Sequence, residues 1–263
     1  MRRNFEGSQG VADDVGPVLA EICEAAAQLI LPLWRSGVAV TQKADESPVT
    51  EADHRAEALI LEALHSRLPE TPVISEEDAA RFGTPDAIGP RFFLVDPLDG
   101  TKAFVRGDTH FTVNIGLIDH GRPVAGAVAA PPTGEVWFTS QGRALKRVGG
   151  GPAAPVHVRP WPRGEALVLI SYTMKEETLQ ALRAQYGFDR TEAMDSSIKL
   201  CRIAEGAADI YPRHGTTMEW DIAAGHAVLE AAGGRLTTPE GAPFTYGKTQ
   251  DGFRNGWFVA RGG

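Results

Sequence analysis

Two aspartates, three positions apart, stand at the end of an apolar run in the middle of the chain. Asp96 and Asp99 follow the stretch Phe-Phe-Leu-Val, and Gly100 and Thr101 come directly after them. Carboxylate oxygens are the ligands that hard divalent cations prefer, and main-chain amides at the start of a helix bind phosphate. A site with both features is typical of phosphoryl transfer or phosphate hydrolysis, although a simple turn would use the same residue types.

Three further acidic groups fall where a strand should end or a helix should begin. Asp53 lies three residues after Thr50, which is the spacing of a helix-capping pair. Glu76 opens an expected acidic loop, and Asp221 precedes a run of small apolar residues, where an acid complements the dipole of a helix. Each acid has an ordinary structural explanation. Taken together with the first pair, they supply the oxygen ligands for about two or three cations and leave an aspartate and a threonine to polarise a water.

Other catalytic patterns are absent from the sequence. It holds no Gly-x-Ser-x-Gly elbow and no Cys-x-x-Cys pair, and its seven histidines lack the spacing of zinc ligands. The glycine run at 149–151 is not followed by the Lys-Ser/Thr of a phosphate-binding loop, so we interpret it as a linker. We interpret His226 as a packed histidine. The carboxylates therefore carry the chemical signal of this chain.

The composition excludes some partners and implies others. The chain has 263 residues, of which 43% are hydrophobic, and this is enough for one large core or two smaller halves. The formal net charge is -8 and there is no basic tract, so we expect no binding to a nucleic-acid polymer. An acidic protein that acts on a small phosphorylated molecule needs bound cations, which become the strongest local charges of the site.

The location expected from the sequence is the cytoplasm. Cys23 and Cys201 lie in apolar helical segments and are expected to be buried free thiols, as in a reducing compartment. The basic residues at the N-terminus are not followed by an apolar core, which argues against a signal peptide. No uninterrupted apolar run reaches the roughly 20 residues that span a bilayer. A peripheral position on the inner face of the membrane and a homodimer stay open.

Hydrophobic periodicity predicts helices followed by a run of strands, and then an alternation of strands and helices. We expect helices at 15–34, 50–68, 175–186, 196–205 and 220–232, and strands at 72–75, 111–118, 124–130, 136–140, 144–147, 166–171 and 209–211, with short strands near 235 and 257. A polar loop is expected at 42–48. The Gly/Pro-rich stretch at 149–155 predicts a boundary between an N-terminal half, 1–150, and a C-terminal half, 151–263.

Two motifs resemble the signatures of the inositol monophosphatase superfamily, whose members are magnesium-dependent, lithium-sensitive phosphomonoesterases. They are Asp-Pro-Leu-Asp-Gly-Thr at 96–101 and Trp-Asp-Ile-Ala-Ala-Gly at 220–225. Segments 49–53 and 75–78 match two further blocks, and the resemblance extends from Leu19 to Val259. Within the superfamily, the segments 47–50, 72–78, 111–121, 196–199, 204–206, 211–213 and 225–228 are most similar to the bacterial 3'(2'),5'-bisphosphate nucleotidases. The resemblance implies an α+β fold with alternating helix and sheet layers (αβαβα) and an active site between the two halves.

The resemblance also implies a set of metal ligands. Glu76, Asp96 and the carbonyl of Leu98 would hold the first Mg2+. Asp96, Asp99 and Asp221 would hold the second, and some members bind a third near Glu76.

Catalytic and substrate-binding roles follow from the same resemblance. Asp53 and Thr101 would orient and deprotonate the attacking water, with Glu76 as a further catalytic residue. The amides of Gly100 and Thr101 would hold the phosphate that is cleaved. The remaining substrate contacts would come from Lys102, Ser196, Lys199, Arg213 and Asp221. A second phosphate needs fixed cations beyond the metals, which Lys199 and Arg213 can supply.

The activity that the resemblance implies is hydrolysis of adenosine 3',5'-bisphosphate to AMP and phosphate, with 3'-phosphoadenylyl sulfate as a second substrate. One alternative is a phosphatase for inositol phosphate, histidinol phosphate or fructose 1,6-bisphosphate. An alternative of another class is a regulatory binding protein of the same superfamily. The chain departs from the pattern at Ala103, where many relatives carry Glu, and at 172–174, where Tyr-Thr-Met replaces a basic residue and a histidine. These departures affect recognition of the base and the 5'-phosphate and leave the metal ligands intact.

Overall fold

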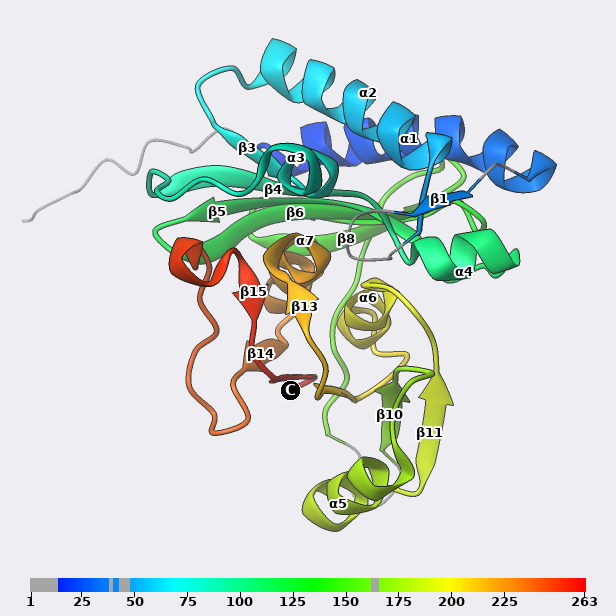
Figure 1. Cartoon of the computed structure of the whole chain (residues 1–263). Coiled ribbons are helices and arrows are strands. Elements are labelled where there is room, and N and C mark those ends of the chain that lie inside the picture. The colour runs from blue at the N-terminus through cyan, green and yellow to red at the C-terminus, as the bar shows by residue number, and fades with distance from the viewer. Residues whose placement is uncertain (1–13, 38–39, 43–47, 162–165) are drawn as a thin grey trace, which may run out of the picture.

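The molecule is built from stacked layers of helices and sheets. The computed structural model describes residues 14–37, 40–42, 48–161 and 166–263. Two long helices form the first layer, a seven-stranded sheet the second, two helices the third, a five-stranded sheet the fourth and one helix the last (Figure 1). This is the αβαβα arrangement that the resemblance implied.

The first layer consists of α1 (Gly16–Ser36) and α2 (Glu51–Arg67). Their apolar residues recur at helical spacing, and Leu19, Ile30 and Ile60 are completely buried in the core that these helices share with the large sheet. Among the described residues, α1 is the one helix long and apolar enough to cross a bilayer. Because its apolar face packs on the sheet, this helix is part of the core. Pro32 lies inside α1, which continues past it to Ser36.

The large sheet is a meander whose strand order follows the chain. Its strands are β3 (Val73–Ser75), β4 (Arg91–Asp99), β5 (Thr112–Asp119), β6 (Arg122–Ala130), β7 (Glu135–Ser140), β8 (Arg143–Val148) and β9 (Ala154–Pro155). β3 runs parallel to β4, and the later neighbours are antiparallel. Two short helices, α3 (Glu76–Phe82) and α4 (Thr101–Arg106), follow β3 and β4. A separate pair, β1 (Val40–Gln42) and β2 (Pro48–Thr50), leads into α2.

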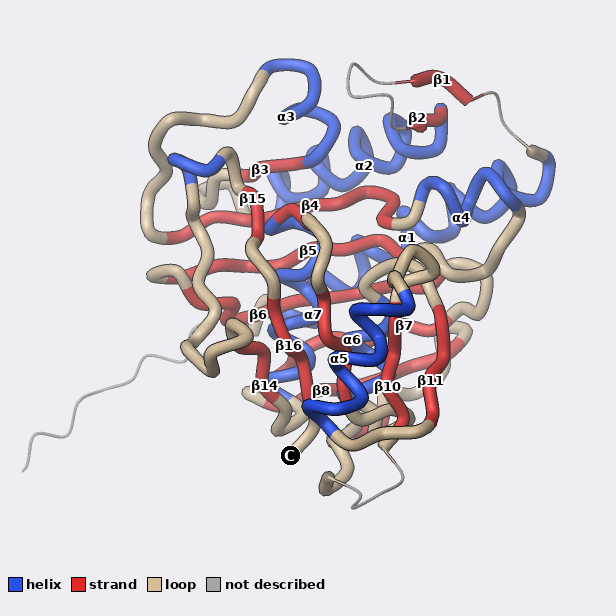
Figure 2. Tube along the Cα trace, turned by 60° about the horizontal axis from the view of Figure 1, so that its bottom comes forward, coloured by secondary structure: helices blue, strands red, loops and turns tan. Residues whose placement is uncertain are grey.

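The second sheet has the order β11-β10-β12-β16-β14 and is mixed. The elements of this part are β10 (Leu167–Ile170), α5 (Glu176–Tyr186), β11 (Arg190–Ala193), α6 (Ile198–Ala204), β12 (Ile210–Arg213), β13 (Thr217–Met218), α7 (Glu219–Ala231), β14 (Arg235–Thr237), the 3-10 helix η1 (Thr249–Asp251), β15 (Arg254–Asn255) and β16 (Phe258–Arg261). Figures 1 and 2 show α6 and α7 between the two sheets, and α5 on the outer face of the small one.

Small residues bring α7 into direct contact with the large sheet. A Cβ atom at Gly116 on β5 would lie 2.8 Å from the Cβ of Ala223, and one at Gly126 on β6 would lie 2.6 Å from the carbonyl oxygen of Ala224. Packed interiors do not tolerate such overlap, so these two positions require glycine. The two glycines therefore allow α7 to pack closely against β5 and β6. The first turn of α7 carries Asp221.

The structure differs from the sequence-based expectation in several places. The acidic residues 76–78 do not form a loop, because they begin the helix α3. The strand β11 was not expected, since its residues Arg-Thr-Glu-Ala carry little apolar signal. The helix expected at 196–205 begins two residues later, at Ile198. Most of the polar loop expected at 42–48 lies outside the described residues.

Candidate active site

The turn between β4 and α4 presents the first pair of carboxylates. Asp96 is buried, and its Oδ1 accepts a hydrogen bond of 2.9 Å from the amide of Leu98, which closes the turn. Gly100 follows with φ +93°, and a Cβ there would lie 2.8 Å from the carbonyl oxygen of His110. Both facts require glycine. Thr101 is the first residue of α4, and the amides of a first helical turn have no partner within the helix. These amides lie where the sequence predicted a phosphate.

The starts of the helices α2 and α4 bring Asp53 and Thr101 together. Asp53 is buried at the start of α2, where its Oδ2 accepts bonds from the amide and hydroxyl of Thr50 at 2.8 and 2.7 Å. This is the capping box that the sequence predicted. The other oxygen, Oδ1, lies 3.3 Å from the hydroxyl of Thr101, which can also donate to the carbonyl of Leu98 at 3.1 Å. A hydroxyl held between two acceptors suits a residue that orients a water.

Glu76 is positioned by a second carboxylate from α2. It is the first residue of α3, and Glu57 accepts hydrogen bonds of 3.1 Å from the amides of Glu77 and Asp78. These bonds satisfy free amides at the helix start. Burial raises the pKa of Glu57, although the hydrogen bonds it accepts oppose this effect. The expected loop is a helix because a carboxylate from another element caps it.

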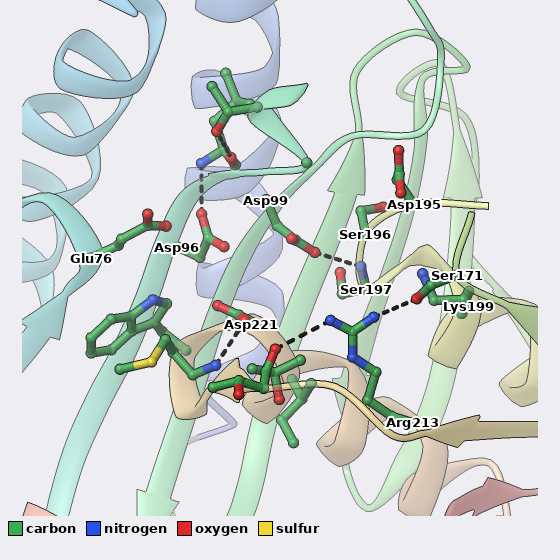
Figure 3. Close-up of a pocket in the computed structure, with 18 of the residues that line it drawn as sticks. Glu76, Asp96, Asp99, Ser171, Asp195, Ser196, Ser197, Lys199, Arg213 and Asp221 are labelled. Atoms are coloured by element: carbon green, nitrogen blue, oxygen red, sulfur yellow. Dashed lines mark hydrogen bonds between the residues drawn. The ribbon is translucent and has the colours of Figure 1, made fainter. Parts of the chain in front are cut away.

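Asp221 comes from the other side of the pocket. It is the third residue of α7, and its Oδ2 accepts a 2.8 Å hydrogen bond from the amide of Met218. The sequence expectation of an acid at a helix start is confirmed. Because α7 lies directly on the large sheet, this carboxylate faces the end of β4, and Figure 3 shows it opposite Asp96 and Asp99.

Asp96, Asp99 and Asp221 have raised pKa values, chiefly because they are buried. Burial, followed by the charges of Glu76, Asp99 and Asp221, raises the pKa of Asp96 well above its usual range. Burial, followed by Asp99 and Glu76, does the same for Asp221. For Asp99, burial raises the pKa to about 6, against the opposing effect of Lys199. We call Glu76, Asp96, Asp99 and Asp221 the acidic floor.

The donor chemistry of the acidic floor fits magnesium. Its ligands are carboxylate oxygens, which Mg2+ prefers, and a bound cation removes the repulsion that raises their pKa values. Among the described residues, no three His, Cys, Asp or Glu side chains are already gathered as tightly as in a metal site. The gathering of four carboxylates in one pocket, three of them buried with raised pKa values, is therefore what supports a cation here.

The acidic floor lies in an open pocket of about 680 Å³. Its walls come from both halves of the chain, and they include every predicted metal ligand and substrate contact (Figure 3). Predicted residues in the wall are Glu76, Asp96, Leu98, Asp99, Gly100, Thr101, Lys102, Ser196, Lys199, Arg213 and Asp221. Asp53 is not part of the wall and reaches it through Thr101. The site roles of these residues stay predictions.

The two predicted cations for a second phosphate differ in their surroundings. Lys199 is only 2% exposed; its Nζ donates to the carbonyl of Met194 at 2.9 Å and lies 4.9 Å from the ring centre of Tyr211. Burial lowers its pKa to about 8, although Asp99 opposes the shift. Arg213 bonds the hydroxyl of Ser171 and the carbonyl of Thr216, and its Nε has no partner among the described residues. Arg213 is thus the more available of the two.

Several pocket residues were not singled out from the sequence. Ser171 and Asp195 line the wall, and so does Arg254 at its rim. Ser197 is also part of the wall, although it is mostly buried, and donates its amide to Asp99 at 2.5 Å. One signal for this contact is visible in the sequence, because Asn114 is a polar residue within a mostly apolar strand and accepts a hydrogen bond from the hydroxyl of Ser197. No local pattern indicates the others.

Comparison with known proteins identifies the class. The model of the "Inositol monophosphatase family" matches residues 12–256. A solved structure of an inositol monophosphatase from Anabaena shares the fold, with a TM-score of 0.71 at 23% identity over 94% of this chain and 90% of that one. The chain belongs to the inositol monophosphatase family, as its motifs indicated.

More similar relatives carry a narrower name. The "3'(2'),5'-bisphosphate nucleotidase CysQ" of Escherichia coli strain K12 is 42% identical over 207 residues, which cover 79% of this chain and 82% of the relative. The protein of the same name from Buchnera aphidicola is 36% identical over 246 residues, 92% of this chain and 91% of the relative. The crystal structure of CysQ from Bacteroides thetaiotaomicron has a TM-score of 0.78 at 30% identity, and covers 96% of this chain and 99% of that one.

Proposed function

We propose that this protein is a magnesium-dependent 3'(2'),5'-bisphosphate nucleotidase, which hydrolyses adenosine 3',5'-bisphosphate to AMP and phosphate. The acidic floor beside the free amides of the β4–α4 turn carries this proposal, because it provides for both a cation and a phosphate. The similarity to bisphosphate nucleotidases over most of the chain supports the choice of substrate. We propose 3'-phosphoadenylyl sulfate as a second substrate, since it carries the same 3'-phosphate.

The acidic floor would hold the metal. Glu76, Asp96 and the Leu98 carbonyl are the proposed ligands of the first ion, and Asp96, Asp99 and Asp221 those of the second. A third ion would bind at Glu76. Bound Mg2+ supplies Lewis-acid chemistry, which activates water and stabilises the charge on the reacting phosphate.

The protein side chains perform the proton transfer and hold the substrate. Thr101, bonded to Asp53, would accept a hydrogen bond from the attacking water and pass its proton toward the carboxylate. The water oxygen bonds to phosphorus while the bond from phosphorus to the 3' oxygen breaks. That oxygen takes up a proton and leaves as the 3'-hydroxyl of AMP. The amides of Gly100 and Thr101 would stabilise the charge that develops on the phosphate oxygens.

The second phosphate of the substrate would lie on the side of the pocket that carries Arg213. Arg213 lines the pocket with a planar guanidinium, whose fork of donors suits a phosphate oxygen. Ser196 and Lys199 would contribute to the same side, and Lys102 would approach from α4. Asp221, between the two sides, would also contact the ribose.

The location and assembly of the enzyme are further parts of the proposal. Cys23 and Cys201 are buried and unpaired, which suits a reducing compartment, so we place the enzyme in the cytoplasm. The covered apolar face of α1 gives no support to a peripheral membrane position. We leave the homodimer as a proposal for measurement of the molecular mass in solution.

A substrate panel tests the proposed function. Phosphate release is measured from adenosine 3',5'-bisphosphate, 3'-phosphoadenylyl sulfate, inositol 1-phosphate, histidinol phosphate and fructose 1,6-bisphosphate, with magnesium and with added lithium. We expect the highest kcat/KM for the bisphosphate nucleotide, no release without magnesium, and inhibition by lithium. Preference for another ester by tenfold or more would replace the proposed substrate. Failure to release phosphate from any ester would contradict the enzyme assignment.

A further inference from the structure

The loop that leads into α6 is attached to the N-terminal half on both sides of Ser196. On one side, Asp195 accepts a hydrogen bond of 2.8 Å from Arg106, at the end of α4. On the other side, the amide of Ser197 donates to Oδ2 of Asp99 at 2.5 Å. The residue between these contacts lines the pocket. The position of Ser196 is therefore set by elements that are distant from it in the chain.

A closed ring of buried hydrogen bonds fixes the second of these contacts. Ser197 donates its hydroxyl to Oδ1 of Asn114 at 2.6 Å, and the amide nitrogen of Asn114 donates to the hydroxyl of Thr112 at 3.2 Å. The Thr112 and Ser197 hydroxyls lie 2.8 Å apart, so Thr112 can donate to Ser197 and complete the ring. Thr112 and Asn114 are completely buried, and Ser197 is 4% exposed. Polar groups so deep in a core are retained without loss of stability only when all of them are bonded.

The backbone between the two contacts is strained. Ser196 has φ +60°, in the left-handed region that residues with a Cβ rarely adopt. Such a conformation is strained and persists only where the surroundings enforce it. Contacts on both sides of Ser196 provide this enforcement. Strain at a pocket residue indicates a position that is held for binding.

We propose that Arg106, Thr112, Asn114 and Ser197 are positioning residues, which hold Ser196 for the nucleoside side of the substrate. We call these four residues the loop anchor. This inference rests on the proposed function, because it assumes a substrate with a nucleoside. Arg106 acts on the loop through Asp195, whereas Ser197 also bonds Asp99, a proposed metal ligand. Loss of Arg106 should therefore weaken the binding of the nucleotide more than the chemical step, while opening the buried ring should affect both.

Two variants separate this role from general stability. Arg106 is half exposed, and surface ion pairs contribute little to stability, so Arg106→Ala should fold normally. The matched control is Arg67→Ala, since Arg67 is also exposed and also reaches a carboxylate at 2.8 Å, but on α2 away from the pocket. Asn114→Ala opens the buried ring. Asn114→Ser keeps a hydroxyl in the ring and should recover part of the loss.

The decisive readout compares two substrates. We expect the KM for adenosine 3',5'-bisphosphate to rise about threefold in Arg106→Ala, with kcat within threefold of the wild type, and about tenfold in Asn114→Ala, where kcat also falls. The kcat/KM for p-nitrophenyl phosphate, which has no nucleoside, should stay within twofold in Arg106→Ala. Arg67→Ala should match the wild type in every respect. Equal losses for both substrates in Arg106→Ala, or unchanged KM values in folded variants, would overturn the proposal.

Hydrogen exchange tests the loop anchor without any substrate. The amides of residues 194–198 should exchange at least fivefold faster in Asn114→Ala than in the wild type, while those of α5 keep their rates. If the wild type does not hydrolyse the bisphosphate, the proposed function fails. In that case this exchange experiment still decides on the loop anchor. Unchanged exchange in a folded Asn114→Ala would show that the ring does not hold the loop.

Discussion

Two clusters of charged residues lie between the layers of this protein, and they solve the same electrostatic problem in opposite ways. The first is the acidic floor. The second, which we call the ion-pair cluster, consists of Glu135, Lys146, Arg202 and Glu205, and it joins β7 and β8 to α6. In the ion-pair cluster each carboxylate bonds both cations, at distances from 2.6 to 3.0 Å. In the acidic floor, Lys199 and Arg213 oppose the raised pKa of Asp99, but burial outweighs them.

The pKa values record this difference. Burial alone would raise the pKa of Glu135, but hydrogen bonds from Arg202 and Lys146 lower it to about 2. Burial and like charges raise the pKa of Asp96 instead. Trp137 packs under both cations of the ion-pair cluster, with ring distances of 4.9 and 5.2 Å, and completes a self-contained structural contact. A buried acid whose pKa is lowered by internal cations serves stability, whereas buried acids whose pKa values stay raised indicate a site for a ligand cation.

The largest expected effect separates activity from stability. Asp96→Asn removes a charge from the acidic floor and leaves the packing nearly unchanged, so we expect phosphatase activity to fall by at least a thousandfold. Because the substitution also relieves repulsion, the melting temperature without magnesium should stay the same or rise. Activity assays and calorimetry on the same preparation measure both. A variant that keeps more than a tenth of the activity would remove Asp96 from the proposed metal site.

Added magnesium should stabilise the wild type and act only on the acidic floor. A ligand at a hundred times its Kd adds about 2.7 kcal/mol to the free energy of unfolding, which amounts to a rise of roughly 5–10 °C in Tm for a chain of this size. Asp96→Asn should lose most of this shift, and Glu135→Gln should keep it. Thermal melts at increasing magnesium concentration measure the shifts. Equal shifts in all three proteins would place the magnesium elsewhere.

The ion-pair cluster should show the opposite pattern. Glu135→Gln weakens charge-assisted hydrogen bonds to Arg202 and Lys146, and we expect a loss of about 1–3 kcal/mol in the free energy of unfolding. The kcat/KM should stay within twofold of the wild type, since Glu135 does not line the pocket. Glu177→Gln, at an exposed position of α5, is the control for the loss of one negative charge. Urea denaturation provides the free energies.

The smallest effect is a dependence on pH. The pKa of Glu135 is lower in the folded protein than its ordinary value of 4.5. Its stabilising contribution is therefore complete above the unfolded value and is lost as the pH falls toward about 2. The difference in Tm between the wild type and Glu135→Gln should be constant from pH 6 to 8 and shrink below pH 4.5. A difference that grows as the pH falls would have the wrong sign for an ion pair.

Local chemistry made parts of the molecule predictable from the sequence. The Thr50–Asp53 capping box depends on residues three positions apart, and the structure confirms it. Apolar periodicity predicted most strands of the large sheet and the helix that carries Asp221. Gly233 and Gly234 indicated where that helix ends. The order of elements around the boundary near 150 was also predicted, while the division into halves there stays a prediction.

Other parts depend on contacts that no local pattern contains. The start of α3 is capped by Glu57, about twenty positions earlier, so an acidic stretch that reads as a loop is helical. Ser197 and Asp99 are 98 positions apart, and only the fold brings them together. The burial of Lys199 could be suspected from its apolar neighbours, but its bond to the Met194 carbonyl could not. Sequence motifs predicted which residues line the pocket better than how each is held.

Because α7 packs closely on the large sheet, two glycines influence the geometry of the pocket. Gly116 and Gly126 allow the short distance between α7 and the sheet. Asp221 belongs to α7, and Asp96 belongs to the sheet. The absence of a Cβ atom at these two glycines therefore helps to determine the distance between the carboxylates of Asp221 and Asp96. A side chain at either glycine would push α7 away from the sheet and change the spacing of the proposed cation ligands, without replacing any of these ligands.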